Sequence, residues 1–280
     1  MKKTLSLALA LTMALSLAAC GNSGGSSSSA PADASGSSSQ ANSSTSSSSA
    51  NTESDLAYVQ DKGTLVVGIT EFEPMDYQNT DGEWIGFDAD LAKEFAESLG
   101  VTVEFQLIDW DNKVMELDGK TIDVVWNGMT LTEDVLAAME CSQPYLINQQ
   151  VVVVPADVAE DYQTEESLAD LNFAVEIGSA GCEVAQANGY SYTEVADQAT
   201  ALLEVASGTA DAAIIDSLMA GAMIGEGTSY ADMTSTVALT SEEYGVGFRK
   251  GSDLAAALNE FLSSKYADGS IQTLAETYGV

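Results

Sequence analysis

The chain has 280 residues, of which 43 are acidic and 9 basic, and it contains no histidine, so its formal net charge is −34. This acidity excludes nucleic acid as an expected partner, because phosphate binding needs clustered lysine and arginine. The absence of histidine excludes Ser-His-Asp and Cys-His catalysis and most zinc sites. We expect no cofactor and no metal. The hydrophobic fraction of 45% is ordinary for a globular protein.

Residues 1–19 have the pattern of a signal peptide, because Lys2 and Lys3 precede an apolar run too short for a comfortable membrane span. The run ends in Leu17-Ala-Ala-Cys20, which resembles a bacterial lipobox and implies that Cys20 is diacylated. The alternative is an ordinary secretory signal with an incidental cysteine. Two acyl chains anchor a protein durably. We therefore expect an extracytoplasmic protein tethered to the membrane, at a cell surface or in a periplasm.

Residues 20–54 follow as a tether that begins with the lipidated cysteine. Serine dominates this segment, and glycine, alanine and asparagine make up most of the rest. Such a composition has too little apolar surface to offset the entropy of ordering. The sequence predicts a disordered tether with a reach of roughly 30 Å, which holds the following part of the chain near the membrane.

Residues 55–280 alternate strand and helix patterns, which indicates an α/β fold class. Asp88 is a good helix N-cap, since leucine and phenylalanine follow it at four-residue spacing. Further helices are predicted to begin near Cys182 and to occupy the C-terminal region that includes 266–278. The apolar runs predict strands at 64–69, 101–105, 122–126, 150–154, 173–177 and 212–215.

Several short motifs lie in order along the same 55–280 region. They are Phe72-Glu-Pro-Met-Asp-Tyr77, Gly86-Phe-Asp-Ala-Asp-Leu-Ala92, Gly119-Lys-Thr-Ile-Asp-Val124 with Asn127-Gly-Met-Thr-Leu-Thr-Glu133, Ser142-Gln-Pro-Tyr145, Ser167-Leu-Ala-Asp-Leu171 and Val246-Gly-Phe-Arg-Lys-Gly251. Each motif alone is weak. Together they resemble the extracellular solute-binding proteins of amino-acid ABC importers, the polar amino-acid-binding type known as solute-binding protein family 3.

This resemblance implies a two-lobed periplasmic-binding-protein fold of type II, with a hinge of two crossing strands. Lobe one would comprise 55–146 and 242–280, and lobe two would comprise 150–238. Family members hold a small-molecule ligand in the cleft between the lobes, close around it by a hinge motion and deliver it to an ABC permease. The resemblance thus implies a monomeric, membrane-tethered binding protein whose partners are its solute and a permease.

The resemblance also implies a ligand site. Two aromatic residues would sandwich the ligand, a loop would donate hydrogen bonds, a helix N-terminus would favour an anion, and an aspartate would pair with an α-ammonium group. The corresponding residues are Phe72 and Trp110, then Asn127, Gly128 and Thr130, then Ser179 and Ala180, and finally Asp216. Each of these has a structural alternative, such as a core aromatic, a turn or an N-cap. Trp110 is expected to be exposed, because it lies between two aspartates.

The main departure from the family lies at Val135. Relatives carry there an arginine that grips the α-carboxylate of the ligand, whereas this chain reads Thr132-Glu-Asp-Val135. Its single arginine, Arg249, matches a different family position. Two ligand classes therefore remain open, beside a peptide, another solute or a degenerate site. One is an α-amino acid held by N–H groups at 128–130 and 179–181, and the other is a cationic amine or polyamine that lacks an α-carboxylate.

Two other function classes are rivals to a transport binding protein. An enzyme related to periplasmic dehydratases would need an acid–base pair such as Glu73 with Asp216, and a sensor partner would present its solute to a separate receptor. We expect a binding protein and not an enzyme, with no catalytic residue. Cys141 and Cys182 map to different lobes, so we expect two thiols and not a disulfide.

Overall fold

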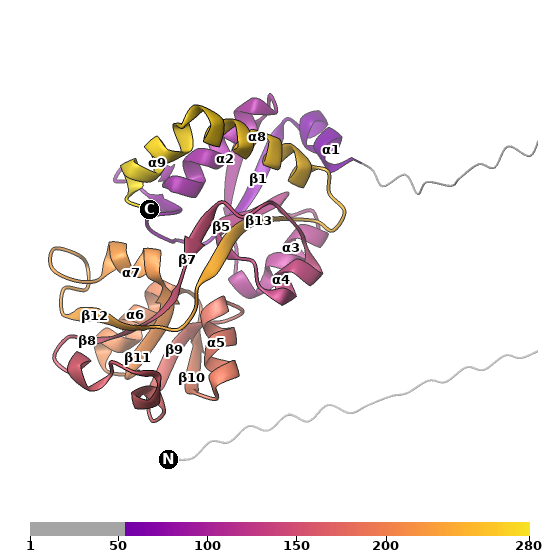
Figure 1. The fold of residues 1–280 in the computed structure, drawn as a ribbon. Helices are drawn as coiled ribbons and strands as arrows, with labels where there is room; N and C mark the ends of the chain where they lie inside the picture. Colours follow the sequence, from indigo (N-terminus) through magenta and orange to yellow (C-terminus); the bar gives the residue numbers. More distant parts are fainter. Residues whose placement is uncertain (1–53) are drawn as a thin grey trace, which may run out of the picture. The chain divides into compact units, whose positions relative to one another are not determined.

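The computed structural model describes residues 54–280, so the predicted signal peptide, Cys20 and almost all of the tether lie outside the described residues. The described part contains two larger β-sheets, each covered by helices, and a two-stranded hairpin (Figure 1). None of its helices is long and apolar enough to cross a membrane. We call the part built on the first sheet lobe one and the part built on the second sheet lobe two.

The sheet of lobe one has the strand order β4-β1-β5-β13-β6, with β7 also paired to β13. Strand β1 pairs in parallel with β4 and β5, whereas β13 runs antiparallel to β5, β6 and β7. The strands are β1 (Thr64–Ile69), β4 (Thr102–Leu107), β5 (Val124–Thr130), β6 (Glu140–Cys141), β7 (Leu146–Asn148) and β13 (Glu242–Phe248). The hairpin joins β2 (Tyr77–Gln78) to β3 (Trp84–Ile85).

The sheet of lobe two has the order β10-β9-β11-β8-β12. Its central strand β11 is parallel to β9 and antiparallel to β8, so this sheet is also mixed. The strands are β8 (Gln150–Pro155), β9 (Asn172–Glu176), β10 (Ser191–Val195), β11 (Ala212–Asp216) and β12 (Met233–Ala238). The chain enters this sheet after β7 and leaves it before β13, so two adjacent crossings connect the lobes (Figure 1).

Helices cover both faces of each sheet, which explains the four consecutive valines at 151–154 within the strand predicted at 150–154. Val151 and Val153 of β8 belong to one apolar cluster, whereas Val152 and Val154 belong to another on the opposite face. A strand buried on both faces reads as a continuous hydrophobic segment. The helices are α1 (Asp55–Lys62), α2 (Phe87–Ser98), α3 (Lys113–Asp118), α4 (Glu133–Ala138), α5 (Ala180–Asn188), α6 (Gln198–Ser207), α7 (Ser217–Met223), α8 (Leu254–Asp268) and α9 (Ser270–Tyr278).

The prediction that Asp88 caps its helix is wrong. Helix α2 begins at Phe87 with Gly86 as N-cap, two residues earlier than a cap at Asp88 would place it. Gly86 has φ +133°, and a Cβ there would lie 2.1 Å from the Met75 carbonyl oxygen, so the close approach of these segments sets the start of the helix. The buried carboxylate of Asp88 instead accepts hydrogen bonds from the Gly128 N–H at 2.6 Å and the Tyr145 hydroxyl at 2.7 Å. Asp88 therefore supports the 127–130 segment.

Candidate functional site

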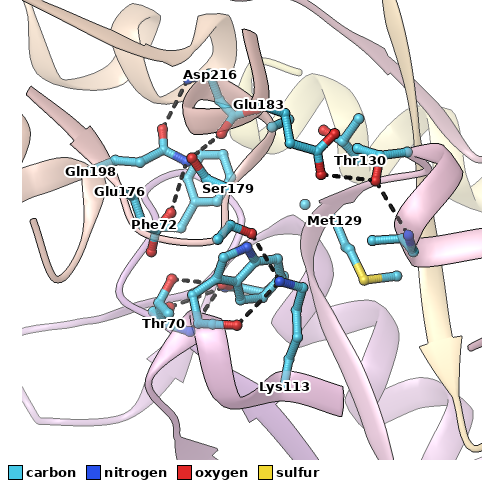
Figure 2. Close-up of a pocket in the computed structure, with 17 residues that line it drawn as sticks. Thr70, Phe72, Lys113, Met129, Thr130, Glu176, Ser179, Glu183, Gln198 and Asp216 are labelled. Carbon is cyan, nitrogen blue, oxygen red and sulfur yellow. Dashed lines mark hydrogen bonds between the residues drawn. The ribbon is translucent and has the colours of Figure 1, made fainter. Parts of the chain in front are cut away.

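One pocket lies where strand ends of the two lobes meet. Asn127, Gly128 and Thr130 belong to β5, Glu176 ends β9 and Asp216 ends β11. Ligand sites of open α/β sheets commonly form outside the carboxyl ends of the strands. The lining is polar with two aromatic residues (Figure 2). It consists of Thr70, Phe72, Trp110, Lys113, Asn127, Gly128, Met129, Thr130, Thr132, Val135, Glu176, Gly178, Ser179, Ala180, Glu183, Gln198 and Asp216.

All eight residues expected at the ligand site from the sequence line this pocket, as does Val135. They are Phe72, Trp110, Asn127, Gly128, Thr130, Ser179, Ala180 and Asp216. Glu73 is exposed and does not line it, so the acid–base pair considered from the sequence is not assembled. The sequence reasoning did not single out Lys113, Glu176 or Gln198. In the sequence, only their positions close to predicted site residues could have indicated two of them, since Lys113 follows Trp110 and Glu176 precedes the 178–181 segment.

The two aromatic residues of the pocket are both buried. Trp110 is 7% exposed and packs with a cluster that includes Val135, which corrects the expectation that it is exposed. Phe72 is 2% exposed and lies against Gly128, where a Cβ would meet its Cε1 atom at 2.6 Å. Gly128 also has φ +55°, which is a backbone region that favours glycine. The close packing of ring and backbone therefore requires glycine at 128.

The polar side chains of the 127–130 segment form hydrogen bonds with residues of lobe one and of the hinge. The Asn127 amide oxygen accepts from the Thr70 N–H and hydroxyl, and its amide nitrogen donates to the Thr70 carbonyl and to Asp76. The Thr130 hydroxyl donates to Glu242 at 2.7 Å. These side chains consequently shape the wall of the pocket, and their hydrogen-bonding capacity is largely used.

Asp216 is also held by protein donors. Its Oδ1 accepts from the Asn148 amide, from the Gln150 amide at 2.9 Å and from the Tyr244 hydroxyl at 2.6 Å. Its Oδ2 accepts from the Gln198 amide. Burial raises the pKa of Asp216 to about 6, and repulsion from Glu242 adds to the rise, whereas the hydrogen bond from Tyr244 opposes it. Asp216 is therefore hydrogen-bonded to residues of the hinge strands β7, β8 and β13.

Contacts across the pocket join the two lobes. The Lys113 ammonium donates to the Gly178 carbonyl at 2.9 Å, and the Thr132 hydroxyl donates to Glu183 at 3.2 Å. A Cβ on Gly178 would lie 3.0 Å from the Asp111 carboxylate oxygen Oδ1. The pocket encloses a cavity of only about 30 Å³. The described lobes therefore meet in a closed arrangement.

A buried pair of acids, Asp76 and Asp88, lies behind the 127–130 segment. Both are fully buried, and each has one carboxylate oxygen without a hydrogen-bond partner in the described part of the chain. Burial, with added repulsion from Asp88, raises the pKa of Asp76, and burial raises the pKa of Asp88 to about 7. An unfolded aspartate loses its proton near pH 3.9. The pair thus favours folding below about pH 4, and this contribution is lost as the pH rises toward 7.

Asp76→Asn is expected to raise stability at pH 8 by about 1 kcal/mol and to make the loss between pH 4 and 7 shallower. The amide keeps an acceptor for Asn127 and removes the buried negative charge with its repulsion from Asp88. Urea unfolding at pH 4.5, 6 and 8 measures this effect. The exposed Asp81→Asn substitution is the matched control. A stability at pH 8 equal to or below that of the wild type would contradict this account of the pair.

The sequence of residues 65–280 matches the profile of the bacterial extracellular solute-binding proteins, family 3. The chain belongs to this family. Its architecture is accordingly the type II periplasmic-binding-protein fold that the motifs implied, and the prediction of the fold class is confirmed. The family also confirms the predicted role as the extracytoplasmic substrate-binding component of an ABC uptake system.

Two similar proteins match most of the length of this chain. The L-cystine-binding protein TcyJ of Escherichia coli is 29% identical over 230 residues, which are 81% of this chain and 86% of TcyJ. A crystal structure of a mutant of ArgBP from T. maritima is 32% identical with a TM-score of 0.74, covering 80% of this chain and 98% of that one.

One enzyme is also among the relatives. Cyclohexadienyl dehydratase of Pseudomonas aeruginosa is 25% identical over 173 residues, which are 60% of this chain and 65% of the enzyme. The family is nevertheless predominantly one of solute-binding proteins without catalytic activity. Membership in it therefore establishes solute binding for this chain, while the identity of the solute depends on the residues of the pocket.

Proposed function

We propose that this protein captures an amino acid, or a related small solute with an amine group, in the pocket between its lobes and delivers it to an ABC permease. The observation that carries the proposal is that all eight residues expected at a family ligand site line one pocket. The named relatives bind L-cystine and, by its name, arginine. The pocket lies at the meeting point of both lobes, so a bound solute would favour the closed form through contacts with both.

A second ligand class is favoured by the charge of the pocket. Its lining contains three acidic side chains, Glu176, Glu183 and Asp216, against the single basic side chain of Lys113 among the described residues. An excess of acidic groups suits a cation without an α-carboxylate, such as an amine or a polyamine. We propose no enzymatic function and no catalytic residue, because the exposed Glu73 lies outside the pocket lining.

Thermal unfolding of the full chain in mild detergent tests the proposal against the twenty amino acids, L-cystine, linear amines, polyamines and short peptides. A ligand at one hundred times its dissociation constant stabilises the folded state by about 2.7 kcal/mol, which is easily measured. We expect stabilisation by one or a few α-amino acids. Stabilisation by amines alone would favour the second class, and no stabilisation by any amine-containing solute would overturn the proposal.

The Val135→Arg substitution distinguishes the two ligand classes by changing the protein, whereas the thermal survey changes the ligand. Val135 lines the pocket and is 8% exposed, so an arginine there adds a cation to the wall. We expect tighter binding of an α-amino acid by about 10-fold, and weaker binding of a cation that lacks the carboxylate. Calorimetric titration measures both. Val135→Met is the control, since it adds length without charge, and equal effects of the two substitutions would argue against a charge effect.

We further propose that Cys20 carries a lipid anchor, that residues 20–54 tether the binding lobes to the membrane, and that the protein acts as a monomer. The support is the lipobox-like sequence and the serine-rich composition. Incorporation of labelled fatty acid in growing cells tests the anchor. We expect labelling of the wild type and none of a Cys20→Ser variant, and equal labelling of both would refute it. Sedimentation of the purified protein tests the monomer.

A further inference from the structure

Two buried ionisable side chains, one acidic and one basic, line the pocket from opposite lobes. Glu176, at the end of β9 in lobe two, is 3% exposed, and Lys113, at the start of α3 in lobe one, is 8% exposed. Among the described residues, no ion pair joins them. Figure 2 shows the two side chains reaching into the pocket from different elements.

Glu176 is the carboxylate with unused hydrogen-bonding capacity in this pocket. Its Oε1 atom is buried and has no hydrogen-bond partner in the described part of the chain. Its Oε2 atom accepts only a long contact of 3.5 Å from the Gln198 amide. Asp216, in contrast, accepts from four protein donors. A buried acceptor without a donor is unfavourable, so an ammonium group that enters the pocket gains more from Glu176 than from Asp216.

Lys113 is the basic group of the pocket that keeps hydrogen-bonding capacity, and its ammonium lies 4.8 Å from the centroid of the Trp110 ring. Two of its three ammonium hydrogens are directed to the Trp110 carbonyl at 3.2 Å and the Gly178 carbonyl at 2.9 Å. The third has no acceptor among the residues the structure describes. Gly178 lies just before α5, whose N-terminal N–H groups and dipole favour a negative charge. A carboxylate at this point would meet both the ammonium of Lys113 and the start of α5.

We propose that Glu176 binds the α-ammonium group of the ligand and that Lys113 binds its α-carboxylate, so the protein selects a zwitterionic α-amino acid. This inference rests on the proposed function and names the ligand class and the residues that hold its head group. It explains how a chain with Val135 in place of the family arginine binds a carboxylate. An amine without a carboxylate would leave its charge beside Lys113 with no counterion.

The same arrangement makes ligand binding depend on pH. Burial, with repulsion from Asp216 on β11 and Asp197 before α6, raises the pKa of Glu176 to about 8, while Lys113 on α3 opposes the rise. Without ligand, the carboxyl group is therefore largely protonated at pH 7. A bound ammonium favours the ionised form, so binding releases a proton. The affinity is expected to increase from pH 6 to pH 8.

Matched variants of the full chain test the assignment by calorimetric titration. The probes are the amino acid selected by the thermal survey, its decarboxylated amine and its N-acetylated form. For L-arginine these are agmatine and Nα-acetyl-L-arginine, for L-histidine histamine and Nα-acetyl-L-histidine, and for L-cystine cystamine and N,N′-diacetyl-L-cystine. For any other selected amino acid, the corresponding decarboxylated and N-acetylated forms are used. Glu176→Gln and Lys113→Met are each expected to weaken amino-acid binding by about 30-fold or more.

Each variant has its own signature. Lys113→Met should abolish the preference for the amino acid over its decarboxylated amine, and Glu176→Gln should abolish the preference over the N-acetyl form and the rise in affinity from pH 6 to 8. The exposed Glu166→Gln and Lys120→Met are the controls and should change the affinity by less than about 3-fold. Unfolding midpoints without ligand verify that each variant is folded.

Three results are distinguishable. Wild-type binding of amino acids with both preferences lost in the named variants supports the inference. Wild-type binding with unchanged preferences in folded Glu176→Gln and Lys113→Met overturns the inference and leaves the proposed function standing. No wild-type binding to any of the twenty amino acids or to L-cystine overturns both the assignment of the zwitterion and the amino-acid form of the proposed function.

Discussion

Arg249→Leu is expected to destabilise the protein by about 3–5 kcal/mol, because it would leave buried carboxylates in lobe one without their guanidinium partner. Arg249 is 8% exposed and lies 3.0 Å from Asp55 and 3.6 Å from Asp123, which is fully buried. It also donates to the carbonyls of Leu117 at 3.2 Å and Ile122 at 2.9 Å. Leucine replaces none of these interactions.

Urea unfolding measures the loss, with Lys265→Met as the control. The partner of Lys265 is Glu94, which is 44% exposed, and surface pairs contribute about 1 kcal/mol or less. The single arginine of the chain is not part of the pocket lining. The dissociation constant of the folded fraction should therefore stay unchanged. A small loss of stability combined with a large loss of affinity would contradict the structural role of Arg249.

Gly128→Ala is expected to weaken ligand binding by about 10- to 100-fold, since overpacking typically costs about 1–3 kcal/mol. The added Cβ would lie 2.6 Å from Phe72 Cε1 and 3.1 Å from Tyr244 Cε2. One of the two rings must move, and both belong to the surroundings of the pocket. Alanine at φ +55° also adds backbone strain, so the free energy of unfolding should decrease by about 1–3 kcal/mol.

Gly100→Ala separates the clash from the strain. Gly100 has φ +76°, and no atom lies within 4 Å of a Cβ built there. This control should lower the free energy of unfolding through strain alone and leave the affinity unchanged. Calorimetric titration and urea unfolding of both variants provide the comparison. An equal loss of affinity in the two variants would show that the packing of Phe72 against residue 128 does not control ligand binding.

The order of motifs in the sequence was enough to predict the fold class and eight of the residues that line the pocket, but not Lys113, Glu176 or Gln198. Strand runs such as 150–154 and 212–215 are visible because both faces of their sheets are buried. Gly128 was visible as a position that needs a residue without a Cβ, but the loop expected at 127–130 is wrong, because these residues form the end of strand β5. Errors arose where a local pattern competed with tertiary contacts, as at Asp88, whose carboxylate binds Gly128 and Tyr145 and does not cap α2.

The sequence by itself determined the family, the two-lobed fold and the loss of the family arginine at Val135, because these depend on the kind and order of residues along the chain. Only the tertiary structure decided which polar groups of the pocket are free. Asp216 is satisfied by Asn148, Gln150, Gln198 and Tyr244, while Glu176 has an oxygen without a donor. Hydrogen-bond satisfaction depends on partners from distant segments, so no local pattern predicts it.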